Sequence, residues 1–162
     1  MFELQQLLSA LDRQGVRYLL CGGLAVNIYG VSRSTADIDI LLDFTEENVD
    51  KFLKLIFLLK YLNSIPLPFQ NLIDAEARKK AVKEKNLIAY SFFSTLKGRM
   101  SLDVLIDVPV TFDDLWERRE TRLYEGVPVQ MVSVDDLIIL KEYAGREQDL
   151  QDVILLSRLK NS

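Results

Sequence analysis

The sequence predicts an α/β (α+β) fold, in which a mixed, twisted sheet of about five strands is flanked by helices. Two observations support this prediction. Short apolar runs rich in β-branched and aromatic residues alternate with segments of helical periodicity. The apolar fraction of 49% and the charged fraction of 27% are typical of globular proteins. Because 162 residues suffice for one ordinary domain and not for two of comfortable size, we expect residues 1–162 to form a single domain with its own core.

The composition excludes several kinds of catalytic site. The single cysteine rules out an intrachain disulfide, and the absence of histidine rules out Ser-His-Asp triads, Cys-His pairs and His-ligated zinc. Acids outnumber bases by 24 to 20, which argues against non-specific nucleic-acid binding through bulk charge. The sequence has neither a signal-type leader nor an apolar run of membrane-spanning length, so we expect a soluble, cytoplasmic protein.

The first predicted elements are a helix, a strand and a second helix. Residues 2–14 have apolar side chains at helical spacing, with Gly15 as the stop: Leu4, Leu7, Leu8 and Leu11. Residues 18–21 form a short apolar strand, and Gly22-Gly23 forms the turn that follows it. Residues 24–29 are then expected to form a short helix that Gly30 closes.

A second strand and a longer helix follow. Residues 37–42 alternate between acidic and apolar side chains, which predicts a strand. Thr45 is a suitable N-cap for a helix with a buried stripe of Val49, Phe52, Leu53 and Ile56. Residues 53–59 are apolar nearly all round, which is consistent either with deep burial or with a contact to a partner chain.

The middle of the chain is irregular and then basic. Residues 61–69 contain Pro66 and Pro68 and are expected to form an irregular connection, followed by a helix over about 70–85. The segment 78–99 carries a net charge of +6. Such a segment could attract a polyanion or could be an ordinary solvated helix face, and the sequence assigns it no role.

The last third of the chain predicts two strands, a hairpin and three helices. Residues 87–93 and 100–108 are expected to be neighbouring antiparallel strands, and 122–124 with 127–131 a hairpin. Thr111 and Ser133 are expected to cap helices, the second of which ends at Gly145. A final helix over about 148–159 should face inward through Leu150, Val153, Ile154 and Leu156, and the two C-terminal helices should pack on the sheet.

Three aspartates are the candidate metal ligands. Asp37 and Asp39 lie two residues apart on a predicted strand, so their Cβ atoms should be roughly 6–7 Å apart on one face. That spacing suits one divalent cation or a pair of them. Asp103 lies between Leu102 and Val104, where a carboxylate is costly unless it meets a cation, whereas Asp107 borders a strand end and solvent.

The glycine pair is a candidate phosphate site. Glycines at a strand-to-helix turn let the backbone approach a phosphate closely. One stretch of the chain resembles the signature of the nucleotidyltransferase (polymerase β-like) superfamily. It consists of Cys21-Gly22-Gly23, thirteen further residues, and then Asp37-Ile-Asp-Ile40. The chain is similar to the AbiEii-like, minimal type of that superfamily. That similarity extends over 84–92, 126–141 and 144–152, and so over most of the chain.

The resemblance implies an activity and a set of roles. Asp37, Asp39 and Asp103 would be catalytic and would bind Mg²⁺, with Mn²⁺ as an alternative, and Gly22 and Gly23 would hold the triphosphate of an NTP such as ATP. An acceptor oxygen would attack the α-phosphorus and pyrophosphate would leave. Asp103 would then be the natural general base.

One position departs from the pattern of this superfamily. Many members carry serine where this chain has Gly23, so here the phosphate grip would come from backbone N–H groups, from Ser32 or Arg33, or from another cation. Arg33 could contact the phosphates or could pair with a carboxylate to stiffen its loop.

Four further residues could have either a functional or a structural role. Lys141 could equally reach the triphosphate or serve the structure, whereas Arg146 with Asp149 is expected to be a surface ion pair. Cys21 is expected to be a small buried filler and not a reactive thiol.

The function expected from these residues is Mg²⁺-dependent transfer of a nucleoside monophosphate to an acceptor. The acceptor could be a partner protein, a tRNA end or a small molecule, and the resemblance implies a setting in a toxin–antitoxin or defence pair. No membrane partner is expected, and nucleic acid is expected only as an acceptor. The alternative is a catalytically silent nucleotidyltransferase fold that serves as an antitoxin or regulatory binding module.

Overall fold

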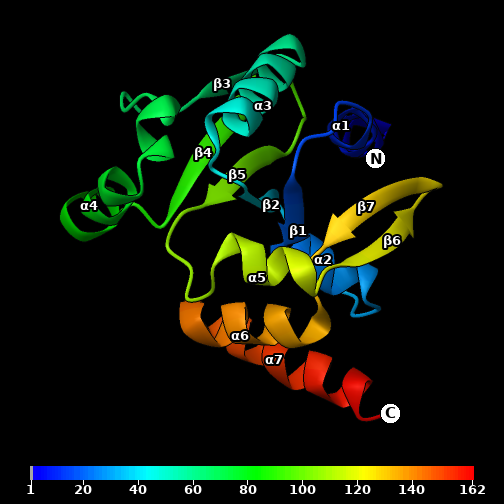
Figure 1. Cartoon of the computed structure of the whole chain (residues 1–162). Helices are drawn as coiled ribbons and strands as arrows, with labels where there is room; N and C mark the ends of the chain where they lie inside the picture. Colours follow the sequence, from blue (N-terminus) through cyan, green and yellow to red (C-terminus); the bar gives the residue numbers. More distant parts are fainter. Residues whose placement is uncertain (1) are drawn as a thin grey trace.

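The computed structural model describes residues 2–162, with the side chains described from Leu4 onward, and consists of a seven-stranded mixed sheet with helices around it (Figure 1). The strands are β1 (Tyr18–Cys21), β2 (Asp37–Leu42), β3 (Tyr61–Asn63), β4 (Ala89–Ser94), β5 (Ser101–Leu105), β6 (Glu120–Tyr124) and β7 (Val127–Met131). The helices are α1 (Phe2–Arg13), α2 (Gly22–Ile28), α3 (Glu46–Leu58), η1 (Phe69–Ile73), α4 (Ala75–Lys85), α5 (Phe112–Glu117), α6 (Val134–Ala144) and α7 (Glu147–Lys160).

The strand order is β3-β4-β5-β2-β1-β7-β6. β2 pairs antiparallel with β1 and parallel with β5, so the sheet is mixed, as expected. The antiparallel pairing of β4 with β5 and the β6–β7 hairpin are confirmed. The sheet has seven strands instead of about five. β3 lies where we expected an irregular connection, because its three residues pair with β4 before the prolines at 66 and 68.

Three predicted boundaries were wrong. α2 begins at Gly22 and not after the glycine pair, with Cys21 as its N-cap. The helix expected over 70–85 is divided, because Asp74 has extended backbone angles between η1 and α4. The strand expected to reach 108 ends at Leu105, since the next two backbone N–H groups both donate to the carbonyl of Ile88.

The predicted helix caps are confirmed. The hydroxyls of Thr45, Thr111 and Ser133 each accept a hydrogen bond from the backbone N–H three residues later. Gly145 ends α6 with φ +67°, a left-handed conformation that favours glycine.

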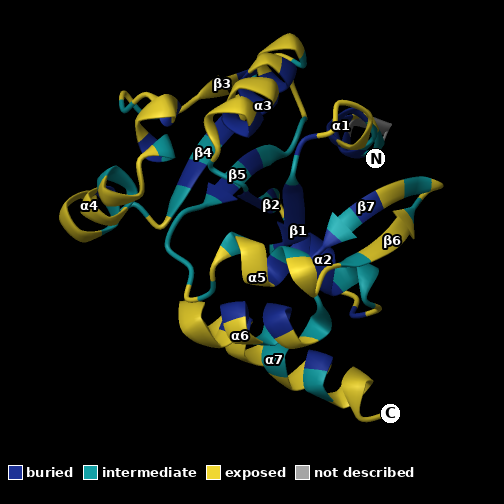
Figure 2. Cartoon of the chain, viewed as in Figure 1, coloured by how far each residue is buried: buried dark blue, intermediate teal, exposed yellow. Residues whose placement is uncertain are grey.

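The core lies between the sheet and the inner faces of α1 and α3 (Figure 2). The predicted apolar stripes of both helices are buried. Phe52 of α3 packs on a cluster of aromatic rings from η1 and β4, formed by Phe69, Tyr90 and Phe92. Of the two alternatives for residues 53–59, deep burial is wrong for the last turn, because Phe57 and Leu58 are exposed, and contact with a partner chain stays a prediction.

α6 and α7 lie side by side at one end of the sheet (Figure 1). The inward face predicted for α7 was largely wrong. Leu150 and Ile154 are 49% and 53% exposed, whereas Leu156 is buried. Asp149 and Asp152 take the inward positions instead. Within residues 2–162, no helix is both long enough and apolar enough to cross a membrane.

Candidate active site

The strand register places the candidate carboxylates in one row. Asp39 of β2 is paired with Cys21 of β1 on one side and with Asp103 of β5 on the other, and Asp103 is paired with Ser91 of β4. Neighbouring strands lie ~4.8 Å apart, and Asp37 precedes Asp39 by two residues on the same face. The sheet therefore brings Asp37, Asp39 and Asp103 together although 64 positions separate Asp39 from Asp103.

These three aspartates line a cavity of about 350 Å³ between the sheet and the C-terminal helices. α6 contributes Leu137, Leu140 and Lys141, and the α6–α7 junction contributes Arg146 and Asp149. The cavity thus has an acidic wall on the sheet and basic side chains on the opposite wall. That arrangement suits a polyphosphate bound together with a cation.

Gly22 lies in this cavity wall, where no side chain fits. Its φ is +67°, and a Cβ atom there would come within 2.0 Å of Asp39 Oδ2. Gly22 is therefore required both by the backbone conformation and by the Asp39 carboxylate that lies against it.

The side chains of Arg33 and Thr35 occupy the space beside Gly23. A Cβ atom at Gly23 would lie 2.9 Å from Arg33 Nη1 and 2.9 Å from Thr35 Oγ1. Gly23, Ser32 and Arg33 do not line the cavity, and Ser32 is exposed. A side chain at position 23 would therefore require Arg33 and Thr35 to shift.

The Asp39 carboxyl is strongly perturbed. Burial, together with the neighbouring charges of Asp103 and Asp37, raises its pKa to about 6, although Lys141 and Arg146 act in the opposite direction. Burial also raises the pKa of Asp103, and a hydrogen bond from Ser91 partly offsets this. Asp103 Oδ1 is buried without a hydrogen-bond partner. Lys141, Arg146 and Ser91 therefore compensate the charge of the carboxylate row only in part.

The residues of the row fit a divalent cation chemically, although they do not form a closed cage. No group of three or more His, Cys, Asp and Glu side chains within the described part of the chain is close enough together to hold a metal ion. An unpartnered buried carboxylate oxygen on Asp103 and the raised pKa of Asp39 are nevertheless what a hard cation would relieve.

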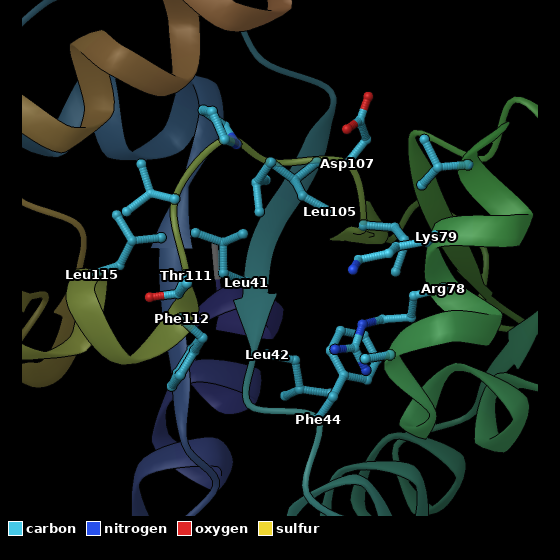
Figure 3. Close-up of a pocket in the computed structure, with 16 residues that line it drawn as sticks. Leu41, Leu42, Phe44, Arg78, Lys79, Leu105, Asp107, Thr111, Phe112 and Leu115 are labelled. Carbon is cyan, nitrogen blue, oxygen red and sulfur yellow. The ribbon is translucent and has the colours of Figure 1, made fainter.

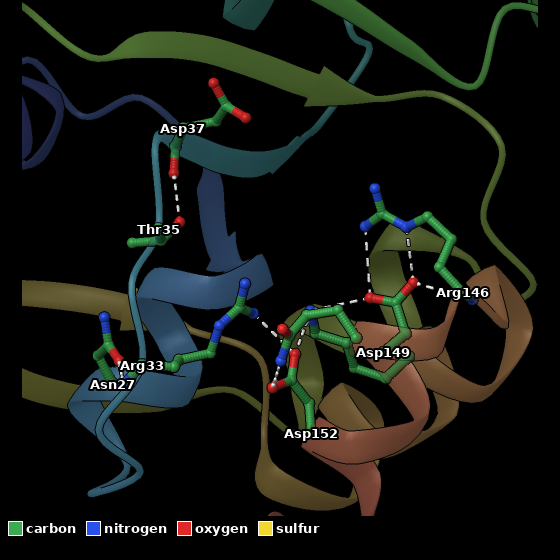
Figure 4. A network of polar contacts seen from close by, with 9 residues as sticks. Asn27, Arg33, Thr35, Asp37, Arg146, Asp149 and Asp152 are labelled. Carbon is green, nitrogen blue, oxygen red and sulfur yellow. Dashed lines mark hydrogen bonds and ion pairs between the residues drawn. The ribbon is translucent and has the colours of Figure 1, made fainter.

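Lys141 and Arg33 are joined by a buried ion-pair network (Figure 4). The Lys141 ammonium is 3.1 Å from Asp149 Oδ1 and 3.0 Å from Asp152 Oδ2, and all three side chains are buried. Arg33 Nη1 donates to Asp152 Oδ2 at 2.7 Å. In this structure Arg33 therefore pairs with a carboxylate, which ties the loop before β2 to α7. Lys141 both lines the cavity and forms ion pairs with Asp149 and Asp152.

Arg146 and Asp149 form the expected ion pair, in which the Arg146 side chain is exposed and the Asp149 side chain is buried. Arg146 Nε donates to Asp149 Oδ2 at 2.8 Å, and the Arg146 backbone N–H donates to the same oxygen. The Asp149 side chain is only 1% exposed because it also accepts from buried Lys141. Asp152, to which the sequence assigned no role, is the second carboxylate of the network and pairs with both Arg33 and Lys141.

Two further residues of the cavity were missed or undervalued. Tyr143 donates its hydroxyl to Asp107 Oδ1 at 2.8 Å, which links α6 to the end of β5. Asp107 therefore lines the cavity instead of simply facing solvent. The sequence carried no signal for this contact, since 36 positions separate the two residues.

Cys21 is a buried filler, as expected. Burial raises the pKa of its thiol well above the ordinary value, so the nucleophilic thiolate is disfavoured.

Comparison with solved structures confirms the fold. The lincosamide adenylyltransferase LnuA, solved with lincomycin bound, superimposes with a TM-score of 0.65 at 16% identity over 98% of this chain and 96% of that one. ANT(2'')-Ia, solved with adenylyl-2''-tobramycin, gives 0.59 at 15% identity over 94% and 84%. An antigenic nucleotidyltransferase-like protein from Paracoccidioides brasiliensis gives 0.57 at 18% identity over 98% and 77%. Comparison with curated proteins found no match.

Sequence comparison gives the family. Residues 1–160 match the family described as nucleotidyltransferase of unknown function, DUF6036. This match spans nearly the whole chain, including the glycine pair, all three aspartates and the ion-pair network. It confirms the superfamily that the glycine pair and the Asp37–Asp39 motif indicated. The chain belongs to the DUF6036 family of nucleotidyltransferases.

Proposed function

We propose that this nucleotidyltransferase moves a nucleoside monophosphate from an NTP, with ATP as the first donor to test, to an acceptor in a Mg²⁺-dependent reaction. The observation that carries the proposal is the carboxylate row. Asp37, Asp39 and Asp103 face one cavity beside Gly22, and the buried Asp103 Oδ1 lacks a partner. Three carboxylates in one cavity that Lys141 and Arg146 compensate only in part are costly unless a cation binds there.

Each residue has a proposed part. Asp37, Asp39 and Asp103 would hold the cation, which would neutralise phosphate charge and orient the donor when bound. Gly22 leaves the cavity wall free of a side chain. Lys141 and Arg146, on the opposite wall, lie where they can attract the triphosphate.

The reaction balances as follows. The acceptor hydroxyl oxygen forms a bond to the α-phosphorus, and the bond from that phosphorus to the bridging oxygen of pyrophosphate breaks. Pyrophosphate leaves with the electron pair, and the hydroxyl proton passes to a carboxylate. Asp103 suits that last step, because burial raises its pKa and so increases its proton affinity.

A small molecule is the acceptor class that the structural neighbours support. LnuA was solved with lincomycin and ANT(2'')-Ia with adenylyl-2''-tobramycin, and this chain matches both over nearly its full length. A partner protein or a tRNA end, in a toxin–antitoxin or defence pair, is the setting that the family resemblance implies. A neighbouring gene that encodes a small helical protein would support that setting.

A catalytically silent binding module is the second candidate. The observation in its favour is that Lys141 and Arg33, two cations expected at the triphosphate, are both engaged by Asp152. A site locked in this way would bind a partner without turnover.

The decisive experiment is incubation of the protein with each α-labelled NTP and Mg²⁺, alone and in lysate of the source cell. Label transfer to an acceptor is expected for the wild type and should fall at least 100-fold in Asp37→Ala. Glu46→Ala, an exposed substitution in α3, is the control. Transfer that survives Asp37→Ala would refute the metal assignment. Stabilisation by NTP–Mg²⁺ without any transfer would favour the binding module.

A further inference from the structure

A second cavity of about 490 Å³ is lined by residues of β2, α4 and α5 and by the segment that ends β5 (Figure 3). Leu105, Asp107 and Val108 line both cavities, so the two share a wall. Asp103 and Leu105 lie two residues apart on one face of β5, which separates them by roughly 7 Å. A residue that lines the second cavity is thus two positions along β5 from the proposed general base.

The second cavity has the volume and lining of a small-molecule site. Drug-sized ligands occupy pockets of roughly 300–1,000 Å³ lined mainly by apolar side chains with a few polar groups. Here the floor and one side are apolar: Leu41, Leu42, Phe44, Leu105, Phe112 and Leu115. The charged residues that line it are Arg78, Lys79 and Asp107.

Arg78 is held in position to receive an anion. Its Nη1 donates to the carbonyls of Leu72 at 2.7 Å and Ile73 at 3.0 Å, and its guanidinium lies 4.6 Å from the ring centroid of Phe44. Figure 3 shows Arg78 and Lys79 projecting from α4 toward the apolar floor. A guanidinium fixed in this way loses little side-chain entropy when it binds a carboxylate or phosphate.

We propose that this second cavity is the acceptor pocket, and that it takes a small amphipathic molecule with an apolar body, one anionic group and a hydroxyl. The apolar body packs on the floor and the anionic group meets Arg78 and Lys79. The hydroxyl then points past Leu105 toward Asp103, attacks the α-phosphorus, and releases pyrophosphate while its proton passes to Asp103. This inference rests on the proposed function and adds the acceptor class to it.

The lining favours a singly charged small molecule over a nucleic acid. The floor offers aliphatic side chains, and the acidic first turn of α5, with Asp113 and Asp114, follows directly after the lining residue Phe112. A polyanion would meet those carboxylates, whereas one anionic group at Arg78 would not. A polycationic acceptor would be repelled by Arg78 and Lys79.

The binding test uses two fluorescent probes that differ in one charge. Anilinonaphthalenesulfonate carries an apolar body and one anionic group, and phenylnaphthylamine is its neutral counterpart. Titration of the full chain should give saturable binding of both. Val110→Trp, which fills the cavity, should abolish both. Arg78→Met should weaken the anionic probe about tenfold and leave the neutral probe unchanged, since one charge-assisted hydrogen bond is lost.

Two controls keep this binding test interpretable. Lys80→Met removes a neighbouring cation outside the cavity and should change neither affinity. Far-UV circular dichroism and Tm establish that each variant is folded, and Lys79→Met replaces Arg78→Met if that variant is not. Three results would each overturn the proposal. They are an equal loss of affinity for both probes in the cation variant, no saturable binding to the wild type, and displacement of the anionic probe by a short single-stranded RNA.

The transfer assay separates this proposal from the proposed function. If the wild type shows Asp37-dependent label transfer, Val110→Trp should lower that transfer at least tenfold while NTP–Mg²⁺ still raises the Tm as in the wild type. Unchanged transfer in Val110→Trp would refute the acceptor pocket and leave the nucleotidyltransferase activity standing. If the wild type shows no Asp37-dependent transfer, the proposed function fails, whatever the probes show.

Discussion

The first and last helices of the chain contrast in what they bury. α1 buries the apolar stripe that its periodicity predicts, with Leu7, Leu8 and Leu11 nearly inaccessible. α7 buries Asp149 and Asp152 and leaves Leu150 and Ile154 exposed. The difference teaches that hydrophobic periodicity orients a helix only where no ion-pair network competes for its inner face.

The hydrogen bonds of the ion-pair network explain why α7 turns its acidic residues inward instead of its apolar ones. Asp149 and Asp152 accept hydrogen bonds from Lys141, from arginines of two separate segments, and from Gln148. Because both carboxylates have hydrogen-bond partners, α7 can bury its acidic face. The ion-pair network in turn fixes α7 against the loop before β2. α7 thus serves the candidate active site, whereas α1 serves the core.

The largest expected effect comes from breaking the α7 network. Asp152→Ala leaves Arg33 and Lys141 without a shared carboxylate in a buried site, so we expect a loss of about 3–5 kcal/mol in the free energy of unfolding. Urea denaturation measures it. Asp135→Ala, which removes an exposed carboxylate of α6, is the matched control and should cost less than ~1 kcal/mol. A cost for Asp152→Ala no larger than the control would show that the network does not hold α7.

The corresponding change in α1 removes an apolar side chain. Leu8 is fully buried, so Leu8→Ala should cost about 2–5 kcal/mol through lost burial and a residual cavity. Gln6→Ala, on the exposed side of the same helix, should change the free energy of unfolding by less than ~0.5 kcal/mol. Equal effects of the two substitutions would contradict the assignment of the buried face.

Asp39 is a half-buried acid that has, among the described residues, no ion-pair partners like those of Asp149 and Asp152. Asp39 has a pKa of about 6 in the folded protein against an ordinary value of 3.8. Between these two pH values the folded protein therefore binds more protons than the unfolded protein does. Its contribution to stability is therefore favourable at low pH and is lost as the pH rises from about 4 to 6. Without divalent cations, Asp39→Asn should raise the Tm at pH 7 and have little effect below pH 4.

Measurement of Tm against pH for wild type and Asp39→Asn tests this sign. The Tm of Asp39→Asn minus that of the wild type should increase between pH 4 and 6 and then level off. A difference that shrinks with rising pH would mean that Asp39 has a favourable partner in the folded state. Addition of Mg²⁺ should stabilise the wild type more than the variant if the carboxylate row binds the cation.

The smallest effect is expected on the outer face of α7. Ile154 is 53% exposed, so Ile154→Ser should change the free energy of unfolding of the monomer by no more than about 0.5–1 kcal/mol. Leu156→Ser, two positions along the same helix but buried, is the internal comparison and should cost several times more. If Ile154→Ser proved as costly as Leu156→Ser, the exposed face would have to be covered in solution.

Much of the fold was predictable because local chemistry specified it. Period-two alternation identified β2, and Thr45, Thr111 and Ser133 identified the helix starts through their capping hydroxyls. β3 was not predictable, because a three-residue strand exists only through its pairing with β4. The sequence could not decide between burial and exposure for Phe57 and Leu58 of α3 for the same kind of reason, since composition cannot show which face has a neighbour.

The candidate site was predictable to the extent that its residues carry a charge pattern. Asp37, Asp39, Asp103 and the glycine pair could be identified because carboxylates in apolar strands and paired glycines are costly without a role. The partners of Lys141 and Arg33 could not be identified, since Asp152 lies 119 positions from Arg33. Spacing along a helix suggested only the local Arg146–Asp149 pair.

The sequence by itself determined the family, the acidic strand and the glycine turn, because these depend on neighbouring residues and on backbone preferences. Tertiary structure alone decided that Asp103 stands beside Asp39, that Arg33 closes the space at Gly23, and that α7 turns its acids inward. The physical reason is that strand register and the desolvation of paired charges depend on contacts between distant segments, which no local pattern of the chain encodes.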